Sequence, residues 1–353
     1  MSVELTLSQR LGNNLFQYAL ARRIADHHGL ELRCRSRPLP SALAINGAGA
    51  AEVSSTLANL VREFPNAPLH LPGRRFDQPV EAWSGQLIDL NGVLNNTAGR
   101  CIRLDGYFQR YEYLAGCEGR IRQWFRQDPL PAQPKHDIVV SIRRGWDYSI
   151  RNWTLPLSYY DNALADIPSR GDIYICGVGI DQETKEHFGK YSPRYFASTP
   201  LNEFAFMASF NRIVLSNSTF AWWAAFLSDA SEIYGPVSSD GVTYGFTGFA
   251  DVDLHMRSPR YREVSTPPSE PVLFSSVTPV PDEKRVDKVW RWLEQTGEPF
   301  NFATIRQRFP GRDTSAILAE ALHAGTIRLV ANQAAARQAA SSNRGLNASR
   351  LWE

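Results

Sequence analysis

Two adjacent arginines at the end of an apolar run are the residues best suited to hold an anion. Arg143 and Arg144 follow the apolar segment 137–142 and precede Gly145. A guanidinium group can donate two parallel hydrogen bonds to phosphate oxygens. Adjacent residues on a strand point to opposite faces, so we expect the two arginines to have different roles. One would bind a diphosphate and the other would pair with a carboxylate, for which Asp147 is the nearest in sequence; the alternative is that both are surface arginines.

A second polar cluster stands between the apolar segments 212–215 and 220–227. Its members are small residues with hydrogen-bonding side chains: Ser216, Asn217, Ser218 and Thr219, followed by Phe220. Ser, Asn and Thr favour the start of a helix, where free N–H groups and the positive end of the helix dipole attract anions. The cluster predicts either a phosphate-binding turn or a well-capped core helix. Trp222 and Trp223 are predicted to be structural anchors.

The metal-ligand motifs are weak. Asp251-Val252-Asp253 has an Asp-x-Asp form, but no strand pattern leads into it, so we interpret it as a chance match. The seven histidines lack metal-ligand spacing. Gly177-Val178-Gly179 lacks the third glycine of a dinucleotide fingerprint and is typical of a turn between strand and helix. We therefore expect chemistry that is independent of a metal.

Strand and helix patterns alternate over most of the chain. Strand patterns occupy 3–7, 102–108, 137–142, 172–176, 212–215 and 232–234. Helical patterns occupy 15–25, 51–60, 113–125, 157–167, 202–210 and 220–227. This order predicts an α/β fold with parallel sheets and helices on both faces. Ligands of such sheets bind beyond the carboxyl ends of the strands. Arg143, Gly177 and Ser216 would then lie along one rim.

Composition divides the chain into several segments. Pro129, Pro131 and Pro134 place a domain boundary near residue 132, and residues 262–283 have the Pro-rich composition of a linker. Three helical patterns and a strand pattern follow, resembling a winged-helix module in outline: 286–295, 302–309, 314–323 and 326–330. The predicted segments are 1–131, 132–261, the linker 262–283, a small helical module at 284–330 and a tail at 331–353.

Charge and cysteine usage restrict the function classes. The 353-residue chain has 38 basic and 36 acidic residues, and the net charge of +2 is too small to indicate a nucleic-acid partner. The four cysteines are widely separated, which indicates reduced thiols and a cytoplasmic protein. The sequence shows no signal peptide and no apolar run long enough to span a membrane. Peripheral attachment to a membrane stays open.

Four segments, in the same order, resemble the signature blocks of the bacterial α-1,2-fucosyltransferase family. These segments are Leu11-Gly12-Asn13-Asn14-Leu15-Phe16-Gln17-Tyr18-Ala19, Asp105-Gly106-Tyr107-Phe108-Gln109, Ser141 to Asp147, and Ser216 to Leu227. The resemblance covers roughly residues 3–240 and leaves out the C-terminal module. The chain departs from the family pattern at several points. Ser141 stands in place of a histidine, Trp146 is an extra residue, and Gly177-Val178-Gly179 replaces an acidic loop. Gln9 and Arg10 replace glycines, and Asn14 replaces a glutamine.

The resemblance implies a GT-B-like fold of two facing Rossmann-like domains, with 1–131 on the acceptor side and 132–261 binding the nucleotide sugar. It implies an inverting, metal-independent transfer of fucose from GDP-fucose to a hydroxyl of a glycan acceptor, without a cofactor. The implied catalytic residues are Arg143, which would hold the leaving diphosphate, and Asp147. The implied donor-binding residues are Gly12, Asn13, Asn14, Ser141, Arg143, Arg144, Ser216, Asn217, Ser218, Thr219 and Phe220.

Two alternatives stay open at this point. The first is a related transferase that uses another nucleotide sugar, since the acidic loop and the histidine of the family are missing. The second is a non-catalytic protein that binds a nucleotide sugar or a glycan and acts through its C-terminal module. The base that deprotonates the acceptor is not identified; Asp105, Glu112 and Asp147 are the carboxylates considered.

Overall fold

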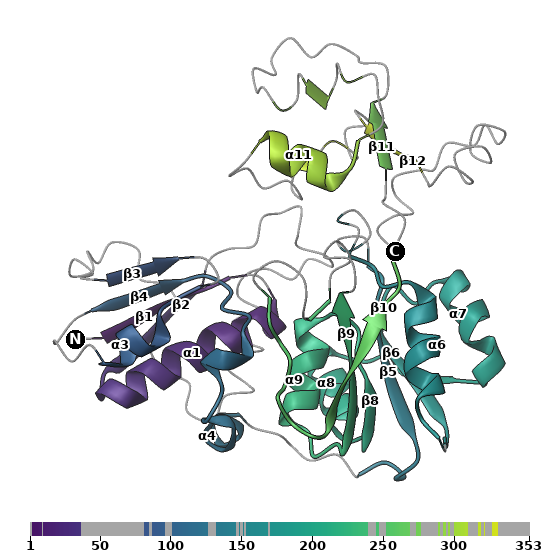
Figure 1. The fold of residues 1–353 in the computed structure, drawn as a ribbon, viewed down its shortest axis with the longest axis horizontal. Helices are drawn as coiled ribbons and strands as arrows, with labels where there is room; N and C mark the ends of the chain where they lie inside the picture. The colour runs from purple at the N-terminus through teal and green to yellow at the C-terminus, as the bar shows by residue number, and fades with distance from the viewer. Residues whose placement is uncertain are drawn as a thin grey trace.

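The computed structural model describes two α/β bodies and part of a smaller C-terminal one (Figure 1). The described residues are 2–8, 10–36, 81–84, 87–95, 101–125, 132–145, 148, 151, 153–168, 170–238, 245–246, 252–268, 273–276, 289, 292–293, 296, 300–309, 317–318, 321 and 327–330. The helix expected at 51–60, the tail at 331–353, and Trp146 and Asp147 lie outside the described residues.

The first body is built on a sheet of four parallel strands in the order β2-β1-β4-β3. Its strands are β1 (Ser2–Leu7), β2 (Glu31–Ser36), β3 (Glu81–Ser84) and β4 (Ile102–Asp105). The alternating pattern of β1 predicts one buried face, and the structure buries the whole strand, including Ser2, Glu4 and Thr6. Helix α1 (Leu11–His28) follows β1 and ends at Gly29, whose φ of +63° is the left-handed conformation that glycine adopts at little cost. The short helix α3 (Leu90–Asn95) packs against α1.

The second body is built on six parallel strands in the order β10-β9-β8-β5-β6-β7. The strands are β5 (Ile138–Arg143), β6 (Ile173–Val178), β7 (Arg194–Tyr195), β8 (Arg212–Val214), β9 (Glu232–Ser238) and β10 (Tyr261–Thr266). Strand β5 lies in the middle and is buried along its whole length, because helices cover both faces. The expected α/β class with parallel sheets is therefore confirmed.

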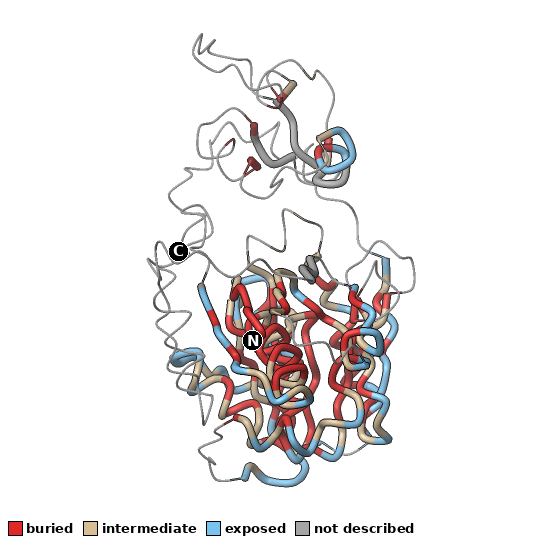
Figure 2. Tube along the Cα trace, turned by 90° about the vertical axis from the view of Figure 1, so that its left-hand side faces the viewer, coloured by how far each residue is buried: buried red, intermediate tan, exposed pale blue. Residues whose placement is uncertain are grey.

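Helices cover the second sheet in two layers (Figure 1). On the outer face, α6 (Leu157–Ala165) and α7 (Gln182–Phe188) pack in one apolar cluster. On the face toward the first body lie α8 (Pro200–Ala208) and α9 (Thr219–Leu227). Figure 2 shows that buried residues run continuously through the strands and through the helices beside them.

A single apolar core joins the two bodies through α1 and α9. The ring of Phe16 lies 4.9 Å from that of Trp222 and 5.0 Å from that of Trp223, centroid to centroid. Both tryptophans are fully buried. Tilted and edge-on aromatic pairs of this kind contribute about 0.5–1.5 kcal/mol each beyond their burial. The prediction that Trp222 and Trp223 are structural anchors is confirmed, and they anchor one body to the other.

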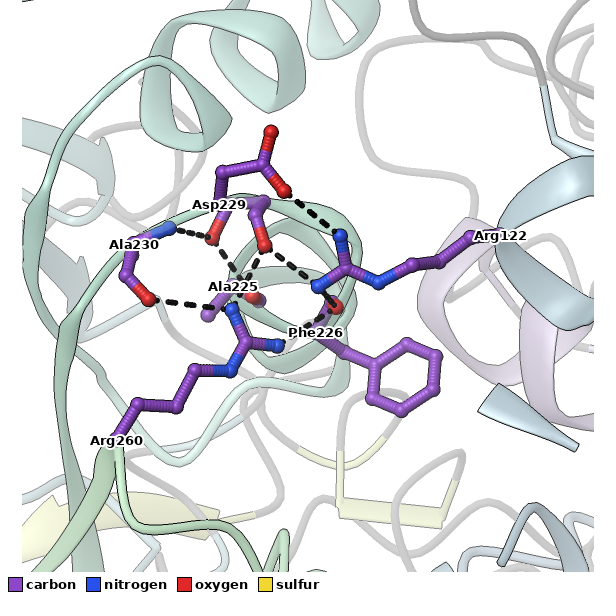
Figure 3. A network of polar contacts seen from close by, with 7 residues as sticks. Arg122, Ala225, Phe226, Asp229, Ala230 and Arg260 are labelled. Carbon is purple, nitrogen blue, oxygen red and sulfur yellow. Dashed lines mark hydrogen bonds and ion pairs between the residues drawn. The ribbon is translucent and has the colours of Figure 1, made fainter. Parts of the chain in front are cut away.

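Two guanidinium groups hold the C-terminal end of α9, as Figure 3 shows. Arg122, from α4 (Glu118–Trp124) in the first body, donates to the carbonyls of Phe226 at 2.9 Å and Ser228 at 2.6 Å. It also pairs with Asp229 at 3.0 Å. Arg260 donates to the same two carbonyls at 3.0 and 2.7 Å. These contacts satisfy carbonyls that a helix end leaves unpaired and place positive charge at the negative end of its dipole.

Two local predictions for the first body were wrong. The helix expected at 113–125 is a short 3₁₀ turn (Tyr111–Tyr113) followed by α4, because Gly116 between them has a φ of +76° that no helix residue adopts. The strand expected at 102–108 ends at Asp105, and Phe108 has a φ of +52°, which is incompatible with a strand.

The segment expected to be a linker also differs from its prediction. It contains most of β10 and all of β11 (Leu273–Ser276), which pairs antiparallel with β12 (Ile327–Val330). Of the prolines in this segment, Pro267 and Pro268 are described, and they follow directly after β10, where they interrupt no sheet hydrogen bonds. Of the three helices expected in the module, α11 (Phe302–Arg308) is described in full, with a capping box formed by Asn301 and Thr304.

Candidate active site

The first turns of α1 and α9 meet although they are far apart in sequence. Gly12 is the second residue of α1, and a Cβ atom at this position would lie 2.5 Å from the backbone nitrogen of Phe220 and 2.7 Å from the carbonyl carbon of Thr219. Only glycine permits this approach. The positive ends of two helix dipoles therefore converge at one point.

Asn13 joins three of the sequence blocks at this junction. Its Oδ1 atom accepts hydrogen bonds from Oγ1 of Thr219 at 3.0 Å and from Nε2 of Gln109 at 2.9 Å. Because the oxygen accepts both bonds, the amide orientation is fixed and Nδ2 keeps two N–H donors. Among the described residues Nδ2 has no partner. Asn13 can therefore donate to a ligand at the junction of the two helices.

Asn14 lies behind this junction. It is 1% exposed, and its Nδ2 donates to the Ser8 carbonyl at 2.8 Å and to Oε1 of Gln17 at 3.0 Å. Gln17 in turn donates to the Gly106 carbonyl at 2.8 Å. The network ties the loop before α1 to the loop after β4. The structure thus places Asn14, a predicted donor-binding residue, as a support for the loop that carries Asn13.

The first turn of α9 has no side-chain cap. Ser218 is the N-cap residue, and its side chain makes no capping hydrogen bond. The first intrahelical bond at this end runs from the Trp222 amide to the Ser218 carbonyl at 3.0 Å. The amides of Thr219 and Phe220 precede that bond, so they belong to the donors that a helix start leaves unsatisfied. The anion-binding interpretation therefore fits this turn better than that of a well-capped core helix.

Arg143 ends β5 on the same rim. Its side chain is largely buried, with 8% of the residue exposed, and its guanidinium carbon lies 4.6 Å from the centre of the Tyr148 ring. The Tyr148 hydroxyl donates to the Asn217 carbonyl at 3.3 Å. Below these residues, the hydroxyls of Ser141 and Ser216 are hydrogen-bonded at 3.0 Å. Arg143 and the turn at the start of α9 are thus tied together by two separate contacts.

Arg144 has a different role, as its position on the strand predicts. Its Nη2 pairs with Oε2 of Glu183 at 2.7 Å, in the first turn of α7. Glu183 is therefore a carboxylate partner of Arg144, while the predicted partner Asp147 lies outside the described residues. Close packing of β5 and β6 brings them together, with the Arg144 amide donating to the Val178 carbonyl at 2.9 Å. The structure directs Arg144 toward the outer helix layer.

Asn217 anchors the loop that follows β5. It is fully buried, and its Nδ2 donates to the Trp153 carbonyl at 2.6 Å. Tyr148, Trp153 and the contact of Gln109 with Asn13 were missed by the sequence reasoning. Gln109 stood in a recognised block, but its partner is 96 residues away. Tyr148 and Trp153 follow Arg143 within ten residues, and this aromatic spacing was the available signal.

Burial controls the ionisation of several groups beneath the site. Burial raises the pKa of the Tyr159 hydroxyl well above its ordinary value, and the group donates to the Leu215 carbonyl at 2.8 Å. Burial also raises the pKa of the Cys34 thiol to about 12, and it raises that of the Cys176 thiol. All four cysteines are free. The two buried thiols stay protonated at neutral pH and are not nucleophiles.

Comparison with known proteins identifies the segment that contains this rim. Residues 119–236, about a third of the chain, match the model of Glycosyl transferase family 11. Over this segment the chain is similar to family 11 glycosyltransferases. The match includes Ser141, Arg143 and the turn Ser216–Thr219, and it confirms the predicted enzyme class over a non-catalytic binding protein.

Two solved structures are similar to this glycosyltransferase at low identity. They are crystal structures of NodZ alpha-1,6-fucosyltransferase soaked with GDP-fucose and of the NodZ fucosyltransferase from Bradyrhizobium. Each is 14% identical to this chain, with a TM-score of 0.34. Both comparisons cover 65% of this chain, and they cover 93% and 92% of the respective NodZ chains. No curated protein matches the chain.

The carboxylates of the glycosyltransferase that were considered for base or metal chemistry occupy different places. Glu112 pairs with Arg110 at 2.7 Å, whereas Asp105 is half-buried at the carboxyl end of β4. Asp253 pairs with Arg257 at 3.3 Å, and Asp251 of the same motif lies outside the described residues. Within the described ranges, no group of three or more His, Cys, Asp or Glu could hold a metal ion.

No described helix is long and apolar enough to cross a membrane.

Proposed function

We propose that this glycosyltransferase transfers fucose from GDP-fucose to a hydroxyl group of a glycan acceptor, with inversion and without a metal ion. The observation that carries the proposal is the meeting of Arg143, the Asn13 amide and the first turns of α1 and α9 around one rim. These groups supply fixed positive charge and aimed N–H donors. Negative charge develops on the diphosphate as its bond to the sugar breaks, and such donors stabilise that charge.

We assign the roles of leaving-group stabiliser to Arg143 and of supporting donors to Ser218, Thr219 and Phe220. The two parallel sheets, facing each other across α1 and α9, support a GT-B-like layout with the acceptor on the first body. Asp105 lies at the carboxyl end of β4 on that side, where a base for the acceptor hydroxyl is needed. Asp147 keeps its proposed catalytic role from the family resemblance.

A different nucleotide sugar is the second candidate donor. The rim after β6 presents Val178, which is 48% exposed, where the family resemblance would place acidic residues. The two carboxylates at the start of α7 are engaged: Asp181 accepts from Thr184, and Glu183 pairs with Arg144. Recognition of guanine by a free carboxylate is therefore not supported at this edge. The donor base would be read by other groups.

Calorimetric titration with GDP, GDP-fucose, GDP-mannose, ADP and UDP separates these donors, followed by a donor hydrolysis assay. We expect GDP to bind and Arg143→Ala to weaken it about 10- to 100-fold, since hydrogen bonds to charged groups contribute about 1.5–3 kcal/mol. Arg194→Ala is the matched control, because Arg194 lies on the edge strand β7 and pairs with Asp172. Unchanged GDP affinity in Arg143→Ala would contradict the diphosphate role.

The reaction outcome needs two further measurements. The anomeric configuration of the product, determined by NMR, should be opposite to that of the donor if the transfer inverts. Activity should persist after treatment with EDTA. An activity that is lost in EDTA and restored by a divalent cation would contradict metal independence.

A further inference from the structure

The aromatic ring under Arg143 has no assigned role in the reaction proposed above. The guanidinium carbon of Arg143 is 4.6 Å from the centroid of Tyr148, well within the range of a cation–π contact. Arg143 is buried at the end of β5, so few water molecules compete for this contact. A guanidinium plane that rests on a ring face still directs its N–H groups outward in its own plane. The ring therefore restrains the arginine without consuming its hydrogen bonds.

Tyr148 is itself held from three sides. Its hydroxyl donates to the Asn217 carbonyl at 3.3 Å. Its ring packs edge-on against Trp153, with centroids 5.9 Å apart and an interplanar angle of 83°. Its carbonyl accepts from the amides of Arg151 at 3.1 Å and Trp153 at 2.9 Å. The buried Asn217 also donates to the Trp153 carbonyl, so the ring is connected to the turn before α9 by two hydrogen-bonded routes.

We propose that Tyr148 is a positioning residue for the donor diphosphate and acts through Arg143. The inference rests on the proposed function, because it assumes that Arg143 binds the diphosphate. An arginine side chain loses several rotatable degrees of freedom when it binds a ligand, and restraint in the free enzyme lowers that cost. The ring face supplies the restraint. The hydroxyl of Tyr148 only fixes the ring against Asn217.

Substitutions at position 148 of the full-length chain test which part of the side chain matters. Tyr148→Phe keeps the face and should bind GDP within threefold of wild type. Tyr148→Leu removes the aromatic ring face and should lower the affinity for GDP about tenfold, as measured by calorimetry. Phenylalanine analogues with one to three ring fluorines keep the shape of the side chain and withdraw charge from the face. We expect GDP affinity and the apparent affinity for GDP-fucose in hydrolysis to fall stepwise with fluorination.

A double-mutant cycle tests whether Tyr148 acts through Arg143. In the Arg143→Gln background, Tyr148→Leu should cause no further loss of GDP affinity, because its target is gone. Tyr191→Leu is the matched control: the Tyr191 ring also faces cations, at 5.1 Å from Lys190 Nζ and 5.6 Å from Arg170 Cζ, but it lies beside α7. It should leave GDP affinity unchanged.

The outcomes separate the inference from the function on which it rests. Failure of the wild-type protein to bind GDP would overturn the proposed function. If wild type binds GDP and Arg143→Gln binds it measurably more weakly, constant affinity across the fluorinated series would overturn the role of the ring face. An equal loss from Tyr148→Leu in both backgrounds would also overturn it, because that pattern indicates a general structural effect. The fluorinated variants keep the test valid even if Tyr148→Leu does not fold.

Discussion

Gly12→Ala is the substitution that most directly tests the junction of α1 and α9. The added methyl would lie 2.5 Å from the Phe220 nitrogen and 2.5 Å from Oγ1 of Thr219. An ordinary contact needs about 3.4 Å, so the two helix starts must separate by about 0.9 Å. That movement would stretch the 3.0 Å bond between Thr219 and Asn13 beyond hydrogen-bonding distance.

Two opposing terms set the size of the effect. Alanine is favoured over glycine in a helix by up to about 1 kcal/mol. Overpacking against backbone atoms costs about 1–3 kcal/mol. We expect a net loss of about 1–2 kcal/mol in the free energy of unfolding. GDP affinity should fall about tenfold, because the N–H donors of both helices are displaced together.

Gly119→Ala provides the matched control. Gly119 is the second residue of α4, as Gly12 is of α1, but a Cβ there meets nothing within 4 Å. Only the propensity term applies, so this variant should be as stable as wild type or up to about 1 kcal/mol more stable. Urea unfolding and GDP calorimetry measure both variants. If the two substitutions shift the unfolding midpoint in the same direction, the close approach of α1 and α9 is refuted.

Two further predictions concern other parts of the molecule. Arg122→Gln should lower the free energy of unfolding by about 2 kcal/mol, since it removes charged donors from the end of α9. The control Arg120→Gln, at an exposed site, should change the free energy of unfolding by less than about 0.5 kcal/mol. Equal effects of the two substitutions would argue against a stabilising role for the Arg122 contacts with α9. Burial raises the pKa of Asp161, but hydrogen bonds from Lys190 and Tyr191 outweigh it and lower the pKa below 3.8. Its stabilising contribution is therefore present above that pH and lost as pH falls through the lowered value. In urea titrations at several acid pH values, Asp161→Asn should make the free energy of unfolding depend less on pH than it does in wild type. An unchanged pH dependence would disprove the lowered pKa of Asp161.

Local sequence patterns predicted the elements that position the site. The alternation of β1, the apolar run of β5 and the helical periodicity of α1 each marked an element that is buried along most of its length. The helical pattern at 15–25 lies within α1, which ends at Gly29 in the left-handed conformation. The Ser216–Thr219 cluster was placed correctly between β8 and α9. These are features that neighbouring residues determine.

The contacts that build the site could not be predicted in the same way. Thr219 and Asn13 are 206 residues apart, and Arg144 and Glu183 are 39 apart. Such pairs depend on strand order and on the packing of two sheets, which no local pattern encodes. Backbone features caused the other failures: Gly116 divides the segment 113–125 that was expected to be one helix, and Phe108 ends a strand pattern by taking a positive φ.

Helix α9 is bound to the first body at both of its ends. Gly12 and Asn13 contact its first turn, and Arg122 holds its last carbonyls. A clamshell motion that swings one sheet away from the other would have to break both attachments and expose two buried tryptophans to water. We therefore expect the two sheets to stay docked when a ligand binds, so that the rim is reached without separating them.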